Sequence, residues 1–65
     1  MKTWKPEDIL AFRKTYNLTR KALGERLGVD ALSVYRWEKG MRKPSRTVEI
    51  LLSMIEKELM RKRKQ

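Results

Sequence analysis

The stretch Asp30 to Arg46, DALSVYRWEKGMRKPSR, decides how this 65-residue chain folds. Asp30 is a good N-cap, because its carboxylate accepts backbone N–H groups of the first helical turn and suits the positive end of the helix dipole. Gly40 readily adopts the left-handed conformation that ends a helix, and Pro44 prevents the helix from continuing. The stretch therefore predicts a helix over residues 31–39.

The helix predicted over residues 31–39 has an anchored face and a displayed face. Val34 and Trp37 lie three residues apart, so they share one side of the helix and suit a protein core. The side chains that point elsewhere are those of Ala31, Leu32, Tyr35 and Arg36. Beside them gather the cations Lys39, Arg42, Lys43 and Arg46. This combination predicts a helix that is held against a polyanion.

The composition limits the possible functions. A chain of 65 residues suffices for a single domain, 1–65, with a small core. Its net charge of +9 favours nucleic acid or another anionic surface as a partner. Because cysteine and histidine are absent, we expect no metal site, no cofactor and no enzymatic activity, and a reducing cytoplasm as the compartment. No apolar run approaches the length of a membrane span.

A first helix is predicted over residues 6–16. Pro6 suits its first turn, since the missing N–H group of proline needs no partner there. Trp4 lies just outside and is placed to pack on Ile9 as a hydrophobic staple. Apolar residues recur at helical spacing from Ile9 to Phe12, so one side of the helix faces the core.

A second helix is predicted over residues 19–27, with Thr19 as its N-cap and Gly28 at its end. Gly24 in its interior costs about 1 kcal/mol relative to alanine, and we expect a close contact with the next helix to explain it. Two short helices joined by a tight glycine turn are the signature of a helix-turn-helix motif.

The last predicted helix covers residues 45–61 and continues into a basic tail, 61–65. Its core-facing stripe consists of Val48, Leu51, Leu52, Ile55 and Leu59. A second apolar line consists of Ile50, Met54 and Met60. These residues are either scattered on the surface or form a self-association surface, and we favour a homodimer interface at Ile50 and Met54. The predicted fold is all-α, a compact domain of four helices.

Two blocks of sequence resemble a known family. LTRKALGERLGV (Leu18 to Val29) and WEKGMRKPS (Trp37 to Ser45) are similar to the lambda-repressor-like, Cro-like helix-turn-helix regulators called the Xre family. The resemblance runs from about Trp4 to Leu52. It implies a bacterial or phage-encoded, nucleoid-associated regulator that binds operator DNA as a dimer, with the second helix of the motif in the major groove.

The resemblance also assigns roles to individual residues. It implies that the base-reading side chains are Ala31, Leu32, Tyr35 and Arg36. Arginine donates two hydrogen bonds to guanine O6 and N7, and small apolar groups meet thymine methyl groups. The alternatives are that Leu32 belongs to the core and that Tyr35 lies at the rim of the interface.

Contacts to the DNA backbone are implied by the same resemblance. The phosphate-binding residues would be Thr19, Arg20, Ser33, Lys39, Arg42, Lys43 and Arg46. Relatives commonly have a glutamine at the place of Arg20, where it bonds a phosphate and supports the reading side chains. The arginine keeps a charge-assisted phosphate contact and leaves open whether the bridging role is retained. Relatives also pair the glutamate at Glu38 with a first-helix arginine, here Arg13, which would lock the first helix to the recognition helix.

These observations lead to one main hypothesis and one alternative. The main hypothesis is a dimeric autorepressor of an inverted-repeat operator in its own promoter, as in phage or mobile-element operons, including restriction-controller and anti-CRISPR-associated types. The alternative is an antitoxin-type module that binds a small toxin as well as DNA. Binding to a membrane surface is disfavoured by the acidic Glu49, Glu56 and Glu58 in a last helix without aromatic residues.

Overall fold

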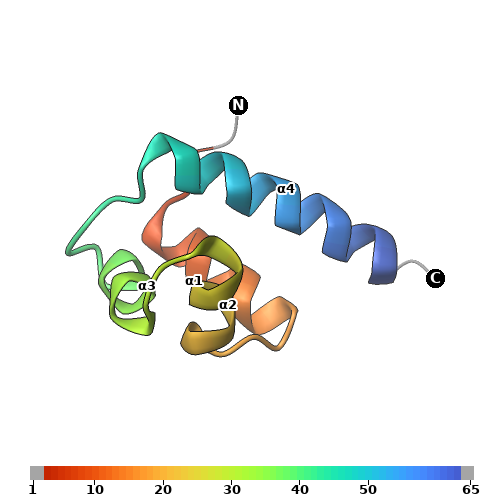
Figure 1. Cartoon of the computed structure of the whole chain (residues 1–65), viewed down its shortest axis with the longest axis horizontal. Helices are drawn as coiled ribbons and strands as arrows, with labels where there is room; N and C mark the ends of the chain where they lie inside the picture. The colour runs from red at the N-terminus through yellow and green to blue at the C-terminus, as the bar shows by residue number, and fades with distance from the viewer. Residues whose placement is uncertain (1–2, 64–65) are drawn as a thin grey trace.

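A computed structural model describes residues 3–63, except for the side chain of Arg63. It contains helices α1 (Pro6–Thr15), α2 (Arg20–Leu27), α3 (Ala31–Glu38) and α4 (Arg46–Arg63), and no strand occurs among the described residues (Figure 1). The predicted all-α fold is confirmed. The observed bounds differ from the predicted ones by one or two residues, as is usual at frayed helix ends.

Side-chain caps account for where α2, α3 and α4 begin, and those at Thr19 and Asp30 are the predicted ones. The side-chain oxygen of Thr19 accepts a hydrogen bond from the backbone N–H of Ala22 at 3.0 Å. A carboxylate oxygen of Asp30 accepts from the backbone N–H of Ser33 at 2.9 Å. Ser45 caps α4 in the same way, through a longer bond of 3.3 Å. Each cap satisfies an N–H group that the helix itself leaves without a partner.

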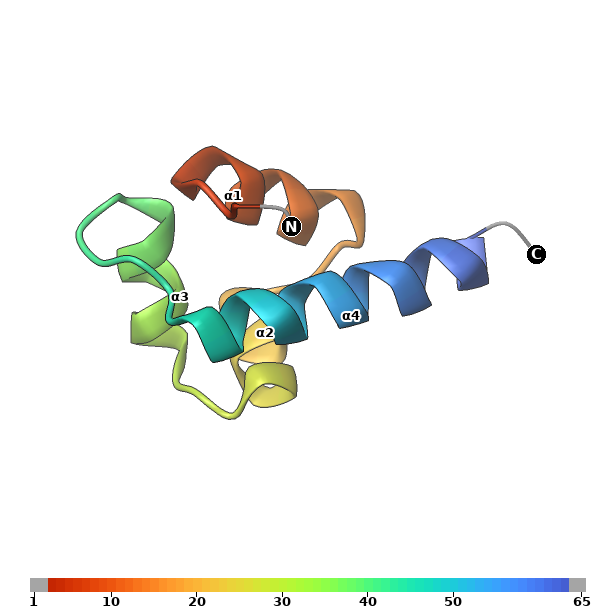
Figure 2. The ribbon, with the colours of Figure 1, turned by 90° about the horizontal axis from the view of Figure 1, so that it is seen from above.

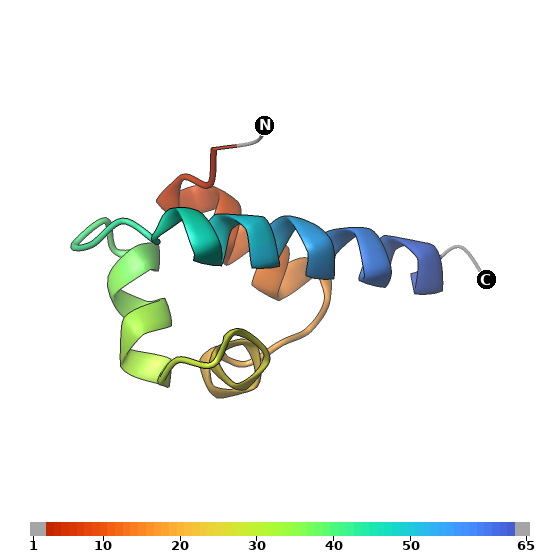
Figure 3. The ribbon, with the colours of Figure 1, turned by 45° about the horizontal axis from the view of Figure 1, so that its top comes forward.

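A tight turn joins α2 to α3 (Figure 3). Gly28 takes the left-handed conformation there, with φ of 76°. A Cβ atom on Gly24 would lie 2.7 Å from the carbonyl oxygen of Val29 and 3.2 Å from the backbone of Asp30. The close contact expected at Gly24 therefore exists, but its partner is the backbone of the turn rather than the body of the next helix.

The core draws side chains from all four helices and from the segment before α1. Its buried apolar residues are Trp4, Ile9, Phe12, Leu23, Leu27, Val34, Trp37, Val48 and Leu52. Three members of the predicted α4 stripe are only partly buried and pack against this cluster, namely Leu51, Ile55 and Leu59. The core thus fixes α3 through Val34 and Trp37, as their spacing predicts.

Trp4 connects the beginning of the chain to α4. Its indole N–H donates a hydrogen bond to the hydroxyl of Ser53 at 3.2 Å, and its backbone N–H donates to a carboxylate oxygen of Glu49 at 3.3 Å. Its ring meets Phe12 edge-on, with 5.5 Å between the ring centroids. The sequence predicts only a hydrophobic staple at the start of α1, whereas in the structure Trp4 also connects the segment before α1 to α4.

The longest helix, α4, lies along the molecule, and its C-terminal end extends beyond the other helices (Figures 1 and 2). The helix continues to Arg63, so residues 61–63 of the predicted basic tail are helical, and residues 64–65 lie outside the described part. Within that part, no helix combines the length and the apolar character that crossing a membrane requires.

Candidate nucleic-acid interface

Helix α3 displays the face that the sequence predicts. The side chains of Leu32 and Tyr35 are 50% and 37% exposed, whereas those of Val34 and Trp37 are buried. Ala31 and Arg36 are intermediate in exposure. Leu32 is therefore not a core residue, and none of the four predicted base-reading side chains is buried. Their contact with bases remains a prediction.

The carboxylate of Glu38 at the end of α3 is held by two arginines. Arg13 of α1 donates from Nε to Oε2 at 2.6 Å and from Nη2 to Oε1 at 3.2 Å. Arg20 of α2 donates from Nε to Oε1 at 3.1 Å. The side chain of Glu38 is only 2% exposed. The ion pair expected between Arg13 and Glu38 is thus present, and it has a third member.

The protonation of Glu38 depends on these two partners. Burial by itself would raise the pKa of Glu38, because it disfavours the charged form. The hydrogen bonds and positive charges of Arg13, and then of Arg20, outweigh burial and lower that pKa below the ordinary value of 4.5. Glu38 therefore stays ionised at neutral pH and ties α1 and α2 to α3.

Arg20 also contacts Tyr35 on the displayed face of α3. Its guanidinium carbon lies 5.1 Å from the centroid of the Tyr35 ring, and the ammonium of Lys39 lies 5.7 Å from the same centroid. The side chain of Arg20 is 39% exposed. No local spacing predicts this arrangement, since Arg20 and Glu38 are 18 residues apart. The one signal was the family's glutamine at this place, which suggested a supporting role.

The two predicted phosphate-binding hydroxyls are both engaged within the protein. Thr19 caps α2. The hydroxyl of Ser33 donates to Asp30 at 2.7 Å, and this bond, followed by that of the Ser33 backbone, lowers the pKa of Asp30. A phosphate that approached Ser33 would meet the negative charge of Asp30. The N-terminus of α2 offers no such carboxylate, since its first turn has no acidic residue.

Four exposed cations follow α3 in the chain. They lie in the loop between α3 and α4 and at the first residue of α4, and they are Lys39, Arg42, Lys43 and Arg46. Gly40 allows this loop to turn away from α3 through a left-handed conformation, with φ of 73° (Figure 2). Met41 at the tip is 66% exposed, and the sequence did not single it out. Positive charge therefore follows the C-terminal end of α3, and Lys39 brings it to the displayed face, 5.7 Å from the centre of the Tyr35 ring.

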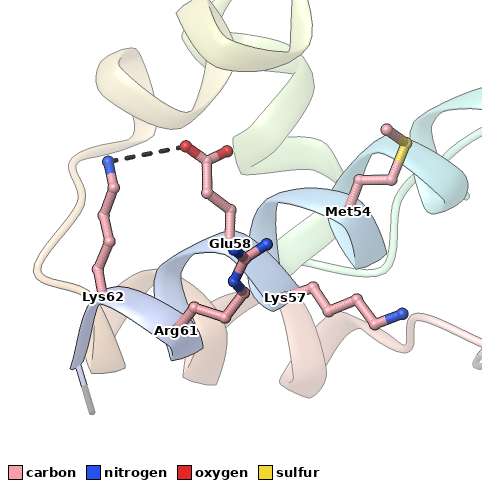
Figure 4. A pocket seen from close by; sticks show the side chains of 5 residues that line it. All are labelled: Met54, Lys57, Glu58, Arg61 and Lys62. Carbon is pink, nitrogen blue, oxygen red and sulfur yellow. Dashed lines mark ion pairs between the residues drawn. The ribbon is translucent and has the colours of Figure 1, made fainter. Parts of the chain in front are cut away.

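The outer face of α4 is apolar in part. Ile50, Met54 and Met60 are 39%, 61% and 46% exposed, so the second apolar line predicted from the sequence lies on the surface. Figure 4 shows an open pocket along this helix, lined by Met54, Lys57, Glu58, Arg61 and Lys62. Within it, Lys62 pairs with Glu58 at 3.7 Å.

Comparison with known proteins agrees with this geometry. A scan against protein families matches residues 9–54, well over half of the chain, to the family described as helix-turn-helix. A search of curated proteins gives no significant match. The matched segment contains α2, the glycine turn and α3, together with α1 from its buried Ile9 onward and the first half of α4. The chain belongs to the helix-turn-helix family of lambda-repressor-like, Xre-type DNA-binding regulators.

Proposed function

We propose that this regulator is a dimeric autorepressor that binds an inverted-repeat operator in its own promoter, as regulators of phage or mobile-element operons do. The observation that carries the proposal is the construction of α3. One side of α3 is buried through Val34 and Trp37, and the other is displayed beside a cationic loop. A short helix of this kind fits the major groove of B-form DNA, while the loop meets the phosphates.

This interface would make two kinds of contact, to base edges and to phosphates. Arg36 would read sequence, because its guanidinium can donate two hydrogen bonds to a guanine edge, and Ala31 and Leu32 would meet thymine methyl groups. The exposed cations of the loop and α4, among them Lys43 and Arg46, would contact phosphates and position the protein without distinguishing bases.

A footprint on the DNA upstream of the protein's own gene tests the proposal. We expect protection of two half-sites whose centres lie about 34 Å apart along the duplex, one DNA turn, because each recognition helix enters one major groove. No protected site in this region would contradict autorepression. A protected single half-site would contradict the dimer.

Substitutions separate base reading from backbone contact. We expect Arg36→Ala to cost about 1 to 3 kcal/mol on the operator and to relax the preference at one base position. We expect the matched control Lys43→Ala to weaken binding to operator and random DNA alike, because a phosphate contact carries no sequence information. Equal losses on operator and random DNA for Arg36→Ala would contradict its assignment as a reading residue.

Salt dependence measures the backbone contacts directly. A dimer that neutralises about six to ten phosphates loses about 10³- to 10⁵-fold in affinity between about 50 and 200 mM salt, since binding releases counterions. Lys43→Ala should reduce the steepness of log affinity plotted against log salt concentration by about 1 per protomer, because one phosphate contact is lost. An affinity that hardly changed with salt would argue against DNA as the partner.

The outer face of α4 supports the dimer. Ile50 and Met54 are exposed apolar side chains one helical turn apart, and burying them between two copies would stabilise a small domain.

Sedimentation equilibrium tests this interface. We expect Met54→Glu to shift the protein to monomer and to weaken operator binding. Ala11→Glu introduces the same charge on the exposed side of α1, and we expect it to leave self-association unchanged. A wild-type protein that remains monomeric both free and on the operator would overturn this role of α4.

A further inference from the structure

We propose that Arg20 is a positioning residue that fixes the ring of Tyr35, and that Tyr35 thereby becomes a specificity-determining residue of the recognition helix. The inference rests on the proposed DNA-binding function and deepens it. It decides between the two roles that the sequence leaves open for Tyr35, a base-reading residue or a bystander at the rim.

The position of Arg20 is set from inside the molecule. Its Nε donates to Oε1 of Glu38 at 3.1 Å, and the same oxygen accepts from Nη2 of Arg13 at 3.2 Å. Because Glu38 is 2% exposed and Arg13 only 15% exposed, this carboxylate has little freedom to move. Arg20 is therefore attached at one edge to a fixed point, although its own side chain is 39% exposed.

The other contact of Arg20 is with the displayed face of α3. Its guanidinium carbon lies 5.1 Å from the centre of the Tyr35 ring, within the range of cation–π attraction. Lys39, one helical turn after Tyr35, brings a second cation to 5.7 Å from that centre. An exposed tyrosine on a helix otherwise exchanges between rotamers. The Arg20 guanidinium, which Glu38 holds in place, and the nearby Lys39 ammonium together favour one rotamer of Tyr35.

Arg20 retains further hydrogen-bonding capacity. Within residues 3–63, the Arg20 side chain donates a hydrogen bond only from Nε, to Glu38, so Nη1 and Nη2 remain available to an external acceptor. The surroundings are cationic, since Glu38 offers one negative charge to two guanidinium groups and Lys39 stands nearby. A DNA phosphate that bonds Arg20 would therefore bond the same group that holds Tyr35. Arg20 would then contact the DNA backbone and hold the base-reading side chain of Tyr35 at the same time.

A double-mutant cycle on DNA tests the link. Arg20→Lys keeps the charge but removes the planar group and the Nε–H donor, and Tyr35→Leu removes the ring but keeps apolar bulk. We expect Arg20→Lys to lower the ratio of operator to random-DNA affinity about fivefold, and to change it less than about twofold when Tyr35 is already leucine. The salt slope should not change, because the charge is kept. Arg26→Lys, at an exposed position of the same helix, is the matched control and should leave the ratio unchanged.

The outcomes separate this inference from the proposed function. Wild-type protein that prefers no DNA sequence would overturn the function and the specificity role together. Wild-type protein that prefers its operator, with effects of Arg20→Lys and Tyr35→Leu that simply multiply, would overturn the role of Arg20 alone. A drop in the ratio that disappears in the Tyr35→Leu background would support it.

A second measurement needs no DNA. In the NMR spectrum of the free protein we expect the side-chain protons of Arg20 to be shifted upfield by the ring of Tyr35, and the shift to vanish in Tyr35→Leu. The ring resonances of Tyr35 should move in Arg20→Lys and stay in place in Arg26→Lys. Arg20 protons at ordinary positions in the wild type would overturn the inference, even if both residues proved important for DNA binding.

Discussion

Helices α3 and α4 differ in how much of each is held by the rest of the protein. Helix α3 has 8 residues, yet it buries Val34 and Trp37 and is tied at Glu38 to both α1 and α2. Helix α4 has 18 residues, and among its described side chains only those of Val48 and Leu52, in its first half, are buried. The orientation of α3 is therefore fixed by its contacts with the rest of the protein, whereas much of the surface of α4 is not in contact with the other helices.

The largest effect expected from this difference is the loss of a buried side chain on α3. Trp37→Ala should lower the free energy of unfolding by about 3 to 5 kcal/mol, because it removes a large buried ring and leaves a cavity. A domain of this size has little more stability than that, so we expect circular dichroism to show a largely unfolded protein at room temperature. Leu32→Ala on the displayed side of α3 should change stability by less than about 0.5 kcal/mol. Similar losses for the two variants would mean that α3 does not have two distinct faces.

The tie at Glu38 should have the next largest effect. Glu38→Gln replaces charge-assisted hydrogen bonds with neutral ones, and we expect a loss of about 2 kcal/mol at neutral pH, measured by urea denaturation. Because the folded-state pKa of Glu38 is below 4.5, the stabilisation is complete above that pH and is lost as pH falls through the folded-state value. The stability difference between wild type and Glu38→Gln should therefore shrink below pH 4.5. A difference that persisted unchanged in acid would show that the charge of Glu38 contributes nothing.

A smaller effect concerns the turn that sets α3 against α2. Gly24→Ala would gain about 1 kcal/mol of helix propensity at an ordinary position. Here the new methyl group would lie 2.7 Å from the carbonyl oxygen of Val29, which is backbone and cannot move aside freely. We expect a net loss of about 1 to 2 kcal/mol in thermal unfolding. The exposed neighbour Glu25→Ala should be close to neutral, and a stabilised Gly24→Ala protein would show that the turn is more adaptable than this geometry implies.

The smallest effect is expected on the outer face of α4. Met54→Ala should change the free energy of unfolding of the dilute monomer by less than about 0.5 kcal/mol, because Met54 is 61% exposed. Leu52→Ala, two residues away and fully buried, should cost about 2 to 5 kcal/mol. A large loss of unfolding free energy for Met54→Ala in the monomer would mean that Met54 contributes to the packing of the monomer.

Features set by neighbouring residues could be predicted from the sequence. The caps at Thr19 and Asp30 and the left-handed glycine at Gly28 are determined within a few residues, and each occurs where the pattern placed it. The apolar spacing of Val34 and Trp37 likewise fixed the buried face of α3.

Contacts between distant segments could not be derived in this way. The hydrogen bond from Trp4 to Ser53 spans 49 residues, and the bond from Arg20 to Glu38 spans 18, so no helical period relates their members. The pair of Arg13 with Glu38 was expected only through the family resemblance, which carries information about packing that one sequence lacks. Met41 was missed because an exposed apolar residue in a loop has no periodic pattern around it.

The hydrogen bonds between Trp4 and α4 have a consequence for how the protein folds during its synthesis. Trp4 leaves the ribosome well before its partners Glu49 and Ser53, which lie 45 and 49 residues later in the chain. Helices α1 to α3 therefore have an incomplete core until α4 emerges. A protein chain that ends before α4 should be collapsed and sensitive to proteases. Completion of the core is thereby coupled to the synthesis of α4, because a shorter fragment would lack the contacts that connect Trp4 to that helix.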